Sequence, residues 1–131
     1  MTNTVGYAIA TMVHIAAHRG GGPLSSRAIA AAIDASPKYL LHVLSQLVSA
    51  DLVHGTRGVS GGYELAKPAS KISVIEIVEA ISGPLDQTDL SLNGLTPMSR
   101  KFLIGALADI TEGARQRLRA ITLDMLKATK A

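Results

Sequence analysis

The segment between residues 55 and 62 constrains the fold more than any other part of the chain, because four of its eight residues are glycine. Glycine adopts backbone conformations with positive φ that other residues avoid, so such a segment favours a tight reversal of the chain. Short runs with the character of strands flank it, at 52–54 and at 63–66. The sequence therefore predicts a β-hairpin with a glycine-rich tip, which Pro68 closes.

Helical patterns precede this hairpin. Apolar residues at three- and four-residue spacing predict a first helix over 5–18, which the glycines and the proline of 20–23 end. Ser25 is a candidate N-cap for a second short helix through Ile33, and residues 34–35 form a tight turn after it. Two short helices separated by a tight turn are thus expected before the hairpin.

The third helix has the strongest start signal in this half of the chain, because Ser36 supplies an N-cap and Pro37 occupies the first helical position. The pattern continues to about Ala50. Three- and four-residue steps predict a buried face made of Leu40, Val43, Leu44 and Leu47.

A fourth helix is predicted after the hairpin. Ser73 and Glu76 have the spacing of a capping box, and Ile72 with Ile77 has the spacing of a hydrophobic staple around it. Gly83, which a proline follows, is expected to end this helix.

Thr96 and Pro97 open a last helix that is predicted to reach toward Lys130. Gly105 and Gly113 weaken a helix by about 1 kcal/mol each relative to alanine, which suggests close packing against another backbone. A coiled-coil-like stripe follows one edge and predicts pairing with a second copy of the chain. The alternative is that the stripe packs only on its own domain. The residues of the stripe are Leu103, Leu107, Ile110, Ala114, Leu118, Ile121 and Met125.

The predicted fold class is mainly α, a winged helix-turn-helix with a small β-hairpin wing and a long C-terminal dimerisation helix. Residues 1–83 form the predicted DNA-binding domain, 84–97 a linker loop and 98–131 the dimerisation helix. In a winged helix-turn-helix the second helix of the pair enters the major groove of duplex DNA, where each base pair presents a distinct pattern of donors and acceptors.

The first turn of the third helix should reach furthest into that groove. Its polar residues are candidate DNA contacts, namely Ser36, Lys38, Tyr39 and His42. Tyr39 fits the protein core about as well, and Tyr63 fits the hairpin core better than a DNA contact. At the hairpin tip Arg57 lies among small residues, which suits a guanidinium in the minor groove or on phosphates. The predicted wing contacts are Arg57, Gly58, Ser60 and Gly61.

The wing segment 57–66 pairs Arg-Gly with further glycines and ends in Tyr-Glu-Leu-Ala. This segment and the helix segment 36–47 resemble the Rrf2 family of winged-helix transcriptional regulators. The resemblance covers 1–83 closely and the rest in outline. It implies a homodimer that binds a palindromic operator through the recognition helix and Arg57, with the long C-terminal helices as the interface.

One departure from the family pattern concerns the cofactor. Cluster-sensing members carry three cysteines in the loop before the long helix, whereas residues 84–99 contain neither cysteine nor histidine. The resemblance therefore implies a member without an iron–sulfur cluster, and the signal it senses is left open. By position alone, the loop 85–95 is a candidate for contact with a metabolite or a partner protein.

Composition excludes several other classes of protein. The chain is 47% hydrophobic and 18% charged with a net charge of +3, which is typical of a globular domain and compatible with a polyanionic partner. It has no cysteine, which excludes disulfides, thiol catalysis and cysteine-ligated metal. His14 and His18 lack a third ligand nearby, so no metal site is expected.

No nucleophile lies beside a suitable acid or base in the sequence, so we expect no enzyme. Because no cysteine is present to hold an iron–sulfur cluster, we expect no cofactor. We also expect no membrane span and a cytoplasmic location. The main hypothesis is a homodimeric DNA-binding regulator that represses transcription by occupying a promoter. The modest net charge motivates an alternative, a winged-helix protein–protein adaptor that docks through the long helix.

Overall fold

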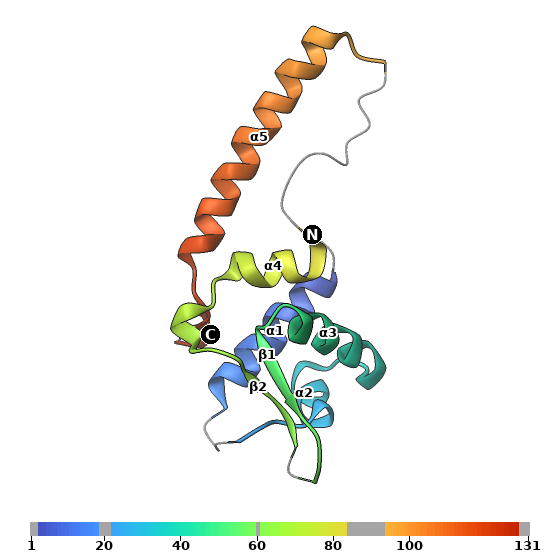
Figure 1. Cartoon of the computed structure of the whole chain (residues 1–131), viewed down its shortest axis with the longest axis vertical. Helices are drawn as coiled ribbons and strands as arrows, with labels where there is room; N and C mark the ends of the chain where they lie inside the picture. Colours follow the sequence, from blue (N-terminus) through green and yellow to red (C-terminus); the bar gives the residue numbers. More distant parts are fainter. Residues whose placement is uncertain (1–2, 19–21, 60, 84–93, 129–131) are drawn as a thin grey trace.

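The computed structural model describes residues 3–18, 22–59, 61–83 and 94–128, and helices form most of it (Figure 1). A two-stranded antiparallel hairpin projects from one end of the folded body, and a long helix extends away from the body in another direction. The prediction of a mainly α winged helix-turn-helix with a small β-hairpin and a long C-terminal helix is confirmed. In chain order the elements are α1 Asn3–Ala17, α2 Ser26–Ile33, α3 Pro37–Ser49, β1 Val53–Thr56, β2 Gly62–Leu65, the 3-10 turn η1 Ala69–Lys71, α4 Val74–Ser82, α5 Pro97–Ala120 and α6 Leu123–Ala128.

Three helices begin where the sequence places a capping side chain. The hydroxyls of Ser25, Ser36 and Thr96 each accept a hydrogen bond from the backbone N–H three residues further along. These caps satisfy donors that the first helical turn leaves unpaired. Asp34 ends α2 in the left-handed region, with φ 56, and so makes the tight turn between α2 and α3.

The main core lies around α1, which packs against α2, α3, α4, α6 and β2. The predicted buried face of α3 is confirmed, because its four apolar residues are fully buried. Ile72 and Ile77 belong to the same core cluster, as does Leu123 of α6. The C-terminal helix is therefore part of the body that holds α3 in place.

The hairpin has a short register that runs from Val53 opposite Leu65 to Thr56 opposite Gly62. Both strands lie within two residues of their predicted bounds. Tyr63 also exchanges two backbone hydrogen bonds with Leu24, at 2.9 and 2.7 Å, so the segment before α2 pairs with the wing. This pairing fixes the wing relative to the helix-turn-helix.

The predicted capping box at α4 is wrong. Ser73 is the N-cap residue, but its side chain makes no capping hydrogen bond. The carboxylate of Glu76 instead forms an ion pair with Lys67 at 3.0 Å. The backbone at the start of α4 is hydrogen-bonded to the segment after α5, since the N–H of Val74 donates to the carbonyl of Ile121 at 2.9 Å.

The predicted single helix from Pro97 to Lys130 is also wrong. α5 ends at Ala120, residues 121–122 are extended, and α6 begins at Leu123. Ile121 is thus outside the helical stripe, and Met125 lies on α6. The break allows the chain to fold back and bury Leu123, which a straight helix could not do.

The C-terminal part of the predicted dimer stripe packs on its own chain. Leu118 and Ile121 contact a small core cluster made of Val5, Val74 and Val78. The alternative given by the sequence, packing on the same domain, describes the contacts of these two half-buried residues. Leu103 and Ile110 remain exposed, Ala114 is exposed as well, and Leu107 is half-buried.

Candidate nucleic-acid interface

The outer face of α3 is polar and exposed. Because the buried residues lie on one side of the helix, the periodicity of 3.6 residues places Lys38, His42 and Ser45 on the opposite side. All three are exposed, and Ser49 continues the same face one turn further along. This face has the size and polarity of a helix that enters the major groove.

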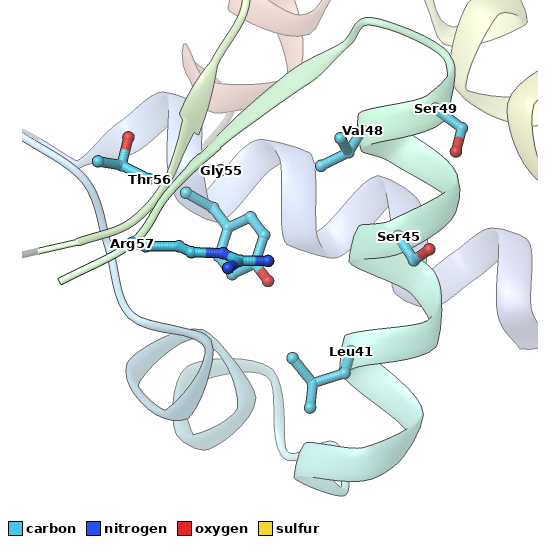
Figure 2. A pocket seen from close by; sticks show the side chains of 8 residues that line it. Leu41, Ser45, Val48, Ser49, Gly55, Thr56 and Arg57 are labelled. Atoms are coloured by element: carbon cyan, nitrogen blue, oxygen red, sulfur yellow. The ribbon is translucent and has the colours of Figure 1, made fainter.

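The wing and α3 border one open groove of about 390 Å³ (Figure 2). Figure 2 shows Leu41, Ser45 and Val48 on the helix side and Thr56 and Arg57 on the wing side. The groove is lined by Leu41, Ser45, Val48, Ser49, Gly55, Thr56, Arg57 and Tyr63. None of these residues is acidic, and hydroxyls come from both walls. Such a lining can accept a phosphate backbone, because hydroxyls and a guanidinium donate to phosphate oxygens.

The four predicted contacts on α3 have different environments. Lys38 and His42 are exposed. Ser36 is exposed too, but its hydroxyl accepts the N–H of Tyr39 at 3.2 Å and so caps the helix. Tyr39 is half-buried, and its hydroxyl is hydrogen-bonded to that of Thr4.

The ring of Tyr39 packs edge-on against Tyr7 of α1, with ring centroids 5.4 Å apart. The sequence left open whether Tyr39 contacts DNA or packs in the protein core, and the structure shows that its ring packs against α1. The hydroxyl of Tyr39 already has a partner in Thr4, whereas Lys38 and His42 are exposed. Lys38 and His42 are therefore the better-placed candidates among the predicted helix residues.

At the wing, Arg57 and Gly58 are exposed, and Gly58 has φ 115. Gly61 is half-buried, and its N–H donates to the carbonyl of Gly58 at 3.0 Å, which closes the tip. A Cβ on Gly61 would lie 2.2 Å from the carbonyl oxygen of Thr56, so this glycine is required by the turn itself. Ser60, the remaining predicted wing contact, lies outside the described residues.

Three residues that the sequence did not single out also line the groove between these two elements. Ser45 and Ser49 line the groove from α3, and Thr56 lines it from β1. The sequence did contain a signal for the two serines. Ser45 and Ser49 lie four residues apart, on the side of the helix away from the buried stripe. Thr56 could not be recognised, because the predicted strand stopped before it.

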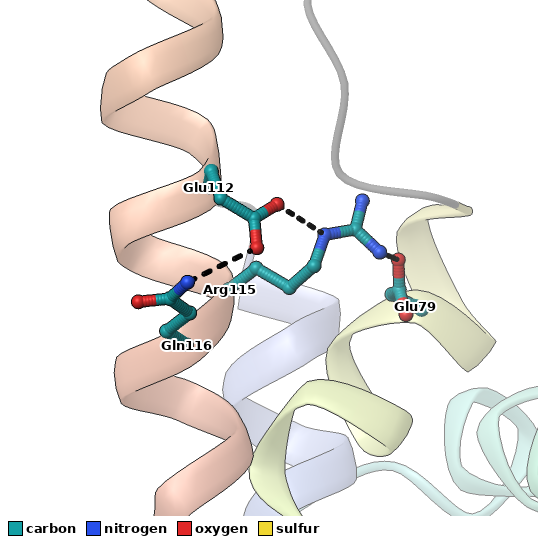
Figure 3. Close-up of polar contacts among 4 residues, drawn as sticks. All are labelled: Glu79, Glu112, Arg115 and Gln116. Carbon is teal, nitrogen blue, oxygen red and sulfur yellow. Dashed lines mark hydrogen bonds and ion pairs between the residues drawn. The ribbon is translucent and has the colours of Figure 1, made fainter.

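A second exposed surface lies on α5. No residue of this helix is fully buried, although it is 24 residues long. Its attachment to the body includes Arg115, which forms an ion pair with Glu79 of α4 at 3.2 Å (Figure 3). Glu112 supports the same guanidinium at 3.9 Å and accepts a hydrogen bond from Gln116 at 3.4 Å. Large exposed apolar residues of α5 are Met98, Phe102, Leu103, Ile104 and Ile110.

The sequence also raised a metal site, a membrane span and a sensor loop. Among the described residues, no three histidine, cysteine or acidic side chains gather where they could hold a metal ion, and His14 with His18 forms no such group. Within the same residues, no helix has both the length and the apolar character needed to cross a membrane. The loop 85–95, which the sequence suggested as a sensor, falls almost wholly outside the described residues.

A family model described as Rrf2, iron-dependent transcriptional regulator, matches residues 1–129. The description raises the question of iron. Thiolates are the usual protein ligands of iron–sulfur clusters, and this chain contains no cysteine. The residues present do not fit a cysteine-ligated cluster.

Individual relatives agree with this family match. The chain is 30% identical to the HTH-type transcriptional regulator CymR of Bacillus subtilis over 92% of its length and 83% of that protein. It is 33% identical to the regulator IscR of Klebsiella pneumoniae, over 96% of its length and 78% of the relative. The solved structure of CymR, the global cysteine regulator of B. subtilis, superposes with a TM-score of 0.81 at 27% identity, and the match covers 100% of this chain and 98% of that one. The chain belongs to the Rrf2 family of DNA-binding helix-turn-helix transcriptional regulators, which are not enzymes.

Proposed function

We propose that this regulator binds a palindromic operator as a homodimer and represses transcription by occupying the promoter. The observation that carries the proposal is the shared groove, because the outer face of α3 and the wing residue Arg57 border the same opening without an acidic side chain. Both elements can therefore engage one duplex at the same time.

In this arrangement α3 enters the major groove with Lys38 and His42 near base edges. The wing reaches the neighbouring minor groove or its phosphates through Arg57. The DNA strand between the two grooves then passes through the groove shown in Figure 2. There the hydroxyl of Ser45 and the guanidinium of Arg57 can donate to its phosphate oxygens, which fixes position without recognising sequence.

The homodimer is supported by α5. A helix that projects from the body with several large apolar side chains exposed requires a partner to remove those side chains from water. A second copy of the chain supplies an identical helix, and most soluble oligomers are built in this symmetric way. The exposed members of the predicted stripe, Leu103 and Ile110, belong to this surface.

Selection of bound sites from random duplex DNA tests the proposal. We expect a palindrome with two half-sites, and binding that falls steeply with salt, as about 6–10 neutralised phosphates require. Binding should persist with a metal chelator present, because the proposed contacts need no iron. Affinity that hardly changes between low and moderate salt, or recovery of a stoichiometric protein partner with no selected site, would contradict the proposal.

Two alanine variants separate the two kinds of contact. Arg57→Ala should weaken selected and random DNA to a similar extent, since a phosphate contact is independent of sequence. Lys38→Ala should cost about 1–3 kcal/mol on the selected site and relax the preference at one position of each half-site, if Lys38 contacts a base. Both losses are measured by titration of labelled duplexes at fixed salt.

Lys71→Ala is the matched control, because Lys71 is an exposed lysine on η1, which packs beside α6 rather than in the groove. Its removal lowers the net charge by the same amount and should leave affinity nearly unchanged. Equal losses for Lys38→Ala on both kinds of DNA would assign this lysine to a phosphate. A loss for Lys71→Ala as large as that for Arg57→Ala would show that only net charge matters.

A further inference from the structure

One apolar side chain of the groove between α3 and the wing lies near the start of α3. Leu41 is 48% exposed, and it lines the groove from the second turn of the helix (Figure 2). The other groove residues of α3 are Ser45, Val48 and Ser49, which lie one turn or more nearer its C-terminus. Leu41 is therefore the groove residue of α3 nearest the end that is expected to reach the base edges.

Leu41 belongs to the exposed side of α3 and not to the protein core. Helical periodicity places it about 60° from Lys38 and about 40° from Ser45 around the helix axis. Among the described residues, neither of the two core clusters includes Leu41. Its side chain lines the same groove as Arg57 of the wing, so it lies on the flank of α3 that faces the wing.

The chemistry of this side chain limits what it can recognise. A leucine side chain neither donates nor accepts a hydrogen bond, whereas base pairs present mostly donors and acceptors in the major groove. The apolar group that protrudes there is the C5-methyl of thymine. Beside a donor or an acceptor, Leu41 would displace water from a polar group without replacing its hydrogen bond, which is unfavourable. Beside a thymine methyl, both apolar groups leave water, which is favourable.

The place of Leu41 relative to the DNA strand points to the same base. In the binding mode proposed above, the strand between the major and the minor groove passes between α3 and the wing. The C5 edge of a pyrimidine lies toward the backbone of its own strand, and its hydrogen-bonding groups lie nearer the centre of the base pair. A side chain on the wing-facing flank of α3 therefore meets C5 of a pyrimidine in that strand first.

We propose that Leu41 contacts the C5-methyl group of a thymine in each half-site and thereby determines specificity for thymine at that position. The proposal rests on the operator binding proposed above and specifies one base of the operator. The contact removes from water a side chain that is half exposed in the protein alone. Lys38 and His42 contact neighbouring base edges through hydrogen bonds, so the apolar contact adds to theirs.

Modified bases in the operator test the methyl contact directly. Once an operator has been selected from random duplexes, each of its thymines is replaced in turn by uracil, which lacks the methyl and keeps the hydrogen-bonding edge. At one thymine of a half-site the dissociation constant should rise about four-fold, the contribution of one methyl group removed from water. Cytosine at that position should weaken binding further, and 5-methylcytosine should recover part of the loss. Titration of labelled duplexes at fixed salt measures each constant.

Three variants assign the methyl contact to one side chain. For Leu41→Ala, the thymine and uracil operators should differ by less than about two-fold, because the shortened side chain no longer reaches the methyl. Leu41→Met keeps an apolar side chain of similar volume and should keep the preference for thymine. Val48→Ala is the matched control, because Val48 is an exposed apolar residue on the same wall of the groove, nearly two turns further along α3. It should keep the full difference between the two operators.

The results separate this contact from operator binding itself. A uracil effect that is equally large for Leu41→Ala and for the unchanged protein would assign the methyl to another side chain and overturn the proposal. A selected operator in which every thymine can be replaced by uracil without loss would overturn it as well. In both cases the binding of an operator would stand. Failure to select any site from random DNA would overturn operator binding and, with it, the contact of Leu41.

Discussion

Replacing Gly62 with alanine is expected to lower operator affinity by at least ten-fold while the helical core stays folded. Gly62 has φ 151, a backbone conformation that residues with a side chain rarely adopt. A Cβ at this position would lie 2.3 Å from the carbonyl oxygen of Leu24. The two hydrogen bonds between Leu24 and Tyr63 cannot survive that collision, so the wing and Arg57 lose their fixed position beside α3.

The measurement pairs operator titration with unfolding of the same variant by urea. Backbone strain of this kind costs on the order of 1–3 kcal/mol, which a domain of typical stability survives. Gly6→Ala on α1 is the control, because Gly6 does not line the groove and its Cβ would meet no atom within 4 Å. Its affinity should change little and its stability should not fall, since alanine favours a helix more than glycine does. Operator binding by Gly62→Ala at the level of the Gly6→Ala variant would show that the wing is dispensable.

Local signals in the sequence were enough for the elements that carry the candidate interface. Ser25 and Ser36 cap their helices as predicted, and Gly83 ends α4. The glycine-rich hairpin forms where four glycines permit it. Each of these features depends on residues within one or two turns of chain. A cap, a turn glycine or a buried stripe can therefore be recognised without knowledge of the tertiary fold.

Features set by distant contacts were not predictable in this way. Ser73 and Glu76 have the spacing of a capping box, but Lys67 and the C-terminal chain supply other partners. Tyr39 has the position of a DNA contact on α3, yet Thr4 on α1 holds its hydroxyl. The groove between α3 and the wing depends on the backbone pairing of Leu24 with Tyr63 of β2. These two residues are far apart in the sequence, so no pattern of neighbouring residues predicts the pairing.

The break after α5 was the largest error, and part of its signal was local. The β-branched pair at 121–122 favours extended backbone, and Asp124 places an acidic side chain in the first turn of α6, where a helix start favours negative charge. The stripe of apolar residues concealed the break, because Leu118 and Ile121 keep helical spacing while they pack on their own body. Spacing alone cannot distinguish a contact with a partner from a contact with the same chain.

Replacing Leu123 with alanine is expected to destabilise the protein by about 2–5 kcal/mol, the range for a fully buried leucine whose cavity is only partly refilled. Leu123 is completely buried in the main core, where α6 packs against α1. The backbone N–H of Leu123 also donates to the carbonyl of Ile72 at 2.8 Å, so α6 fastens the end of α5 to the body.

Loss of this anchor should affect a palindromic operator more than an isolated half-site, because the spacing between two DNA-binding units depends on how firmly α5 is attached. Urea unfolding at one fixed protein concentration measures the first effect, since the stability of a dimer changes with concentration. Titration of the full operator and of a half-site measures the second. Met125→Ala on the same helix is the control, because Met125 is 51% exposed and its truncation should stay within about 0.5 kcal/mol. A loss of stability for Met125→Ala equal to that for Leu123→Ala would show that burial of α6 in the core is not what holds α5 to the body.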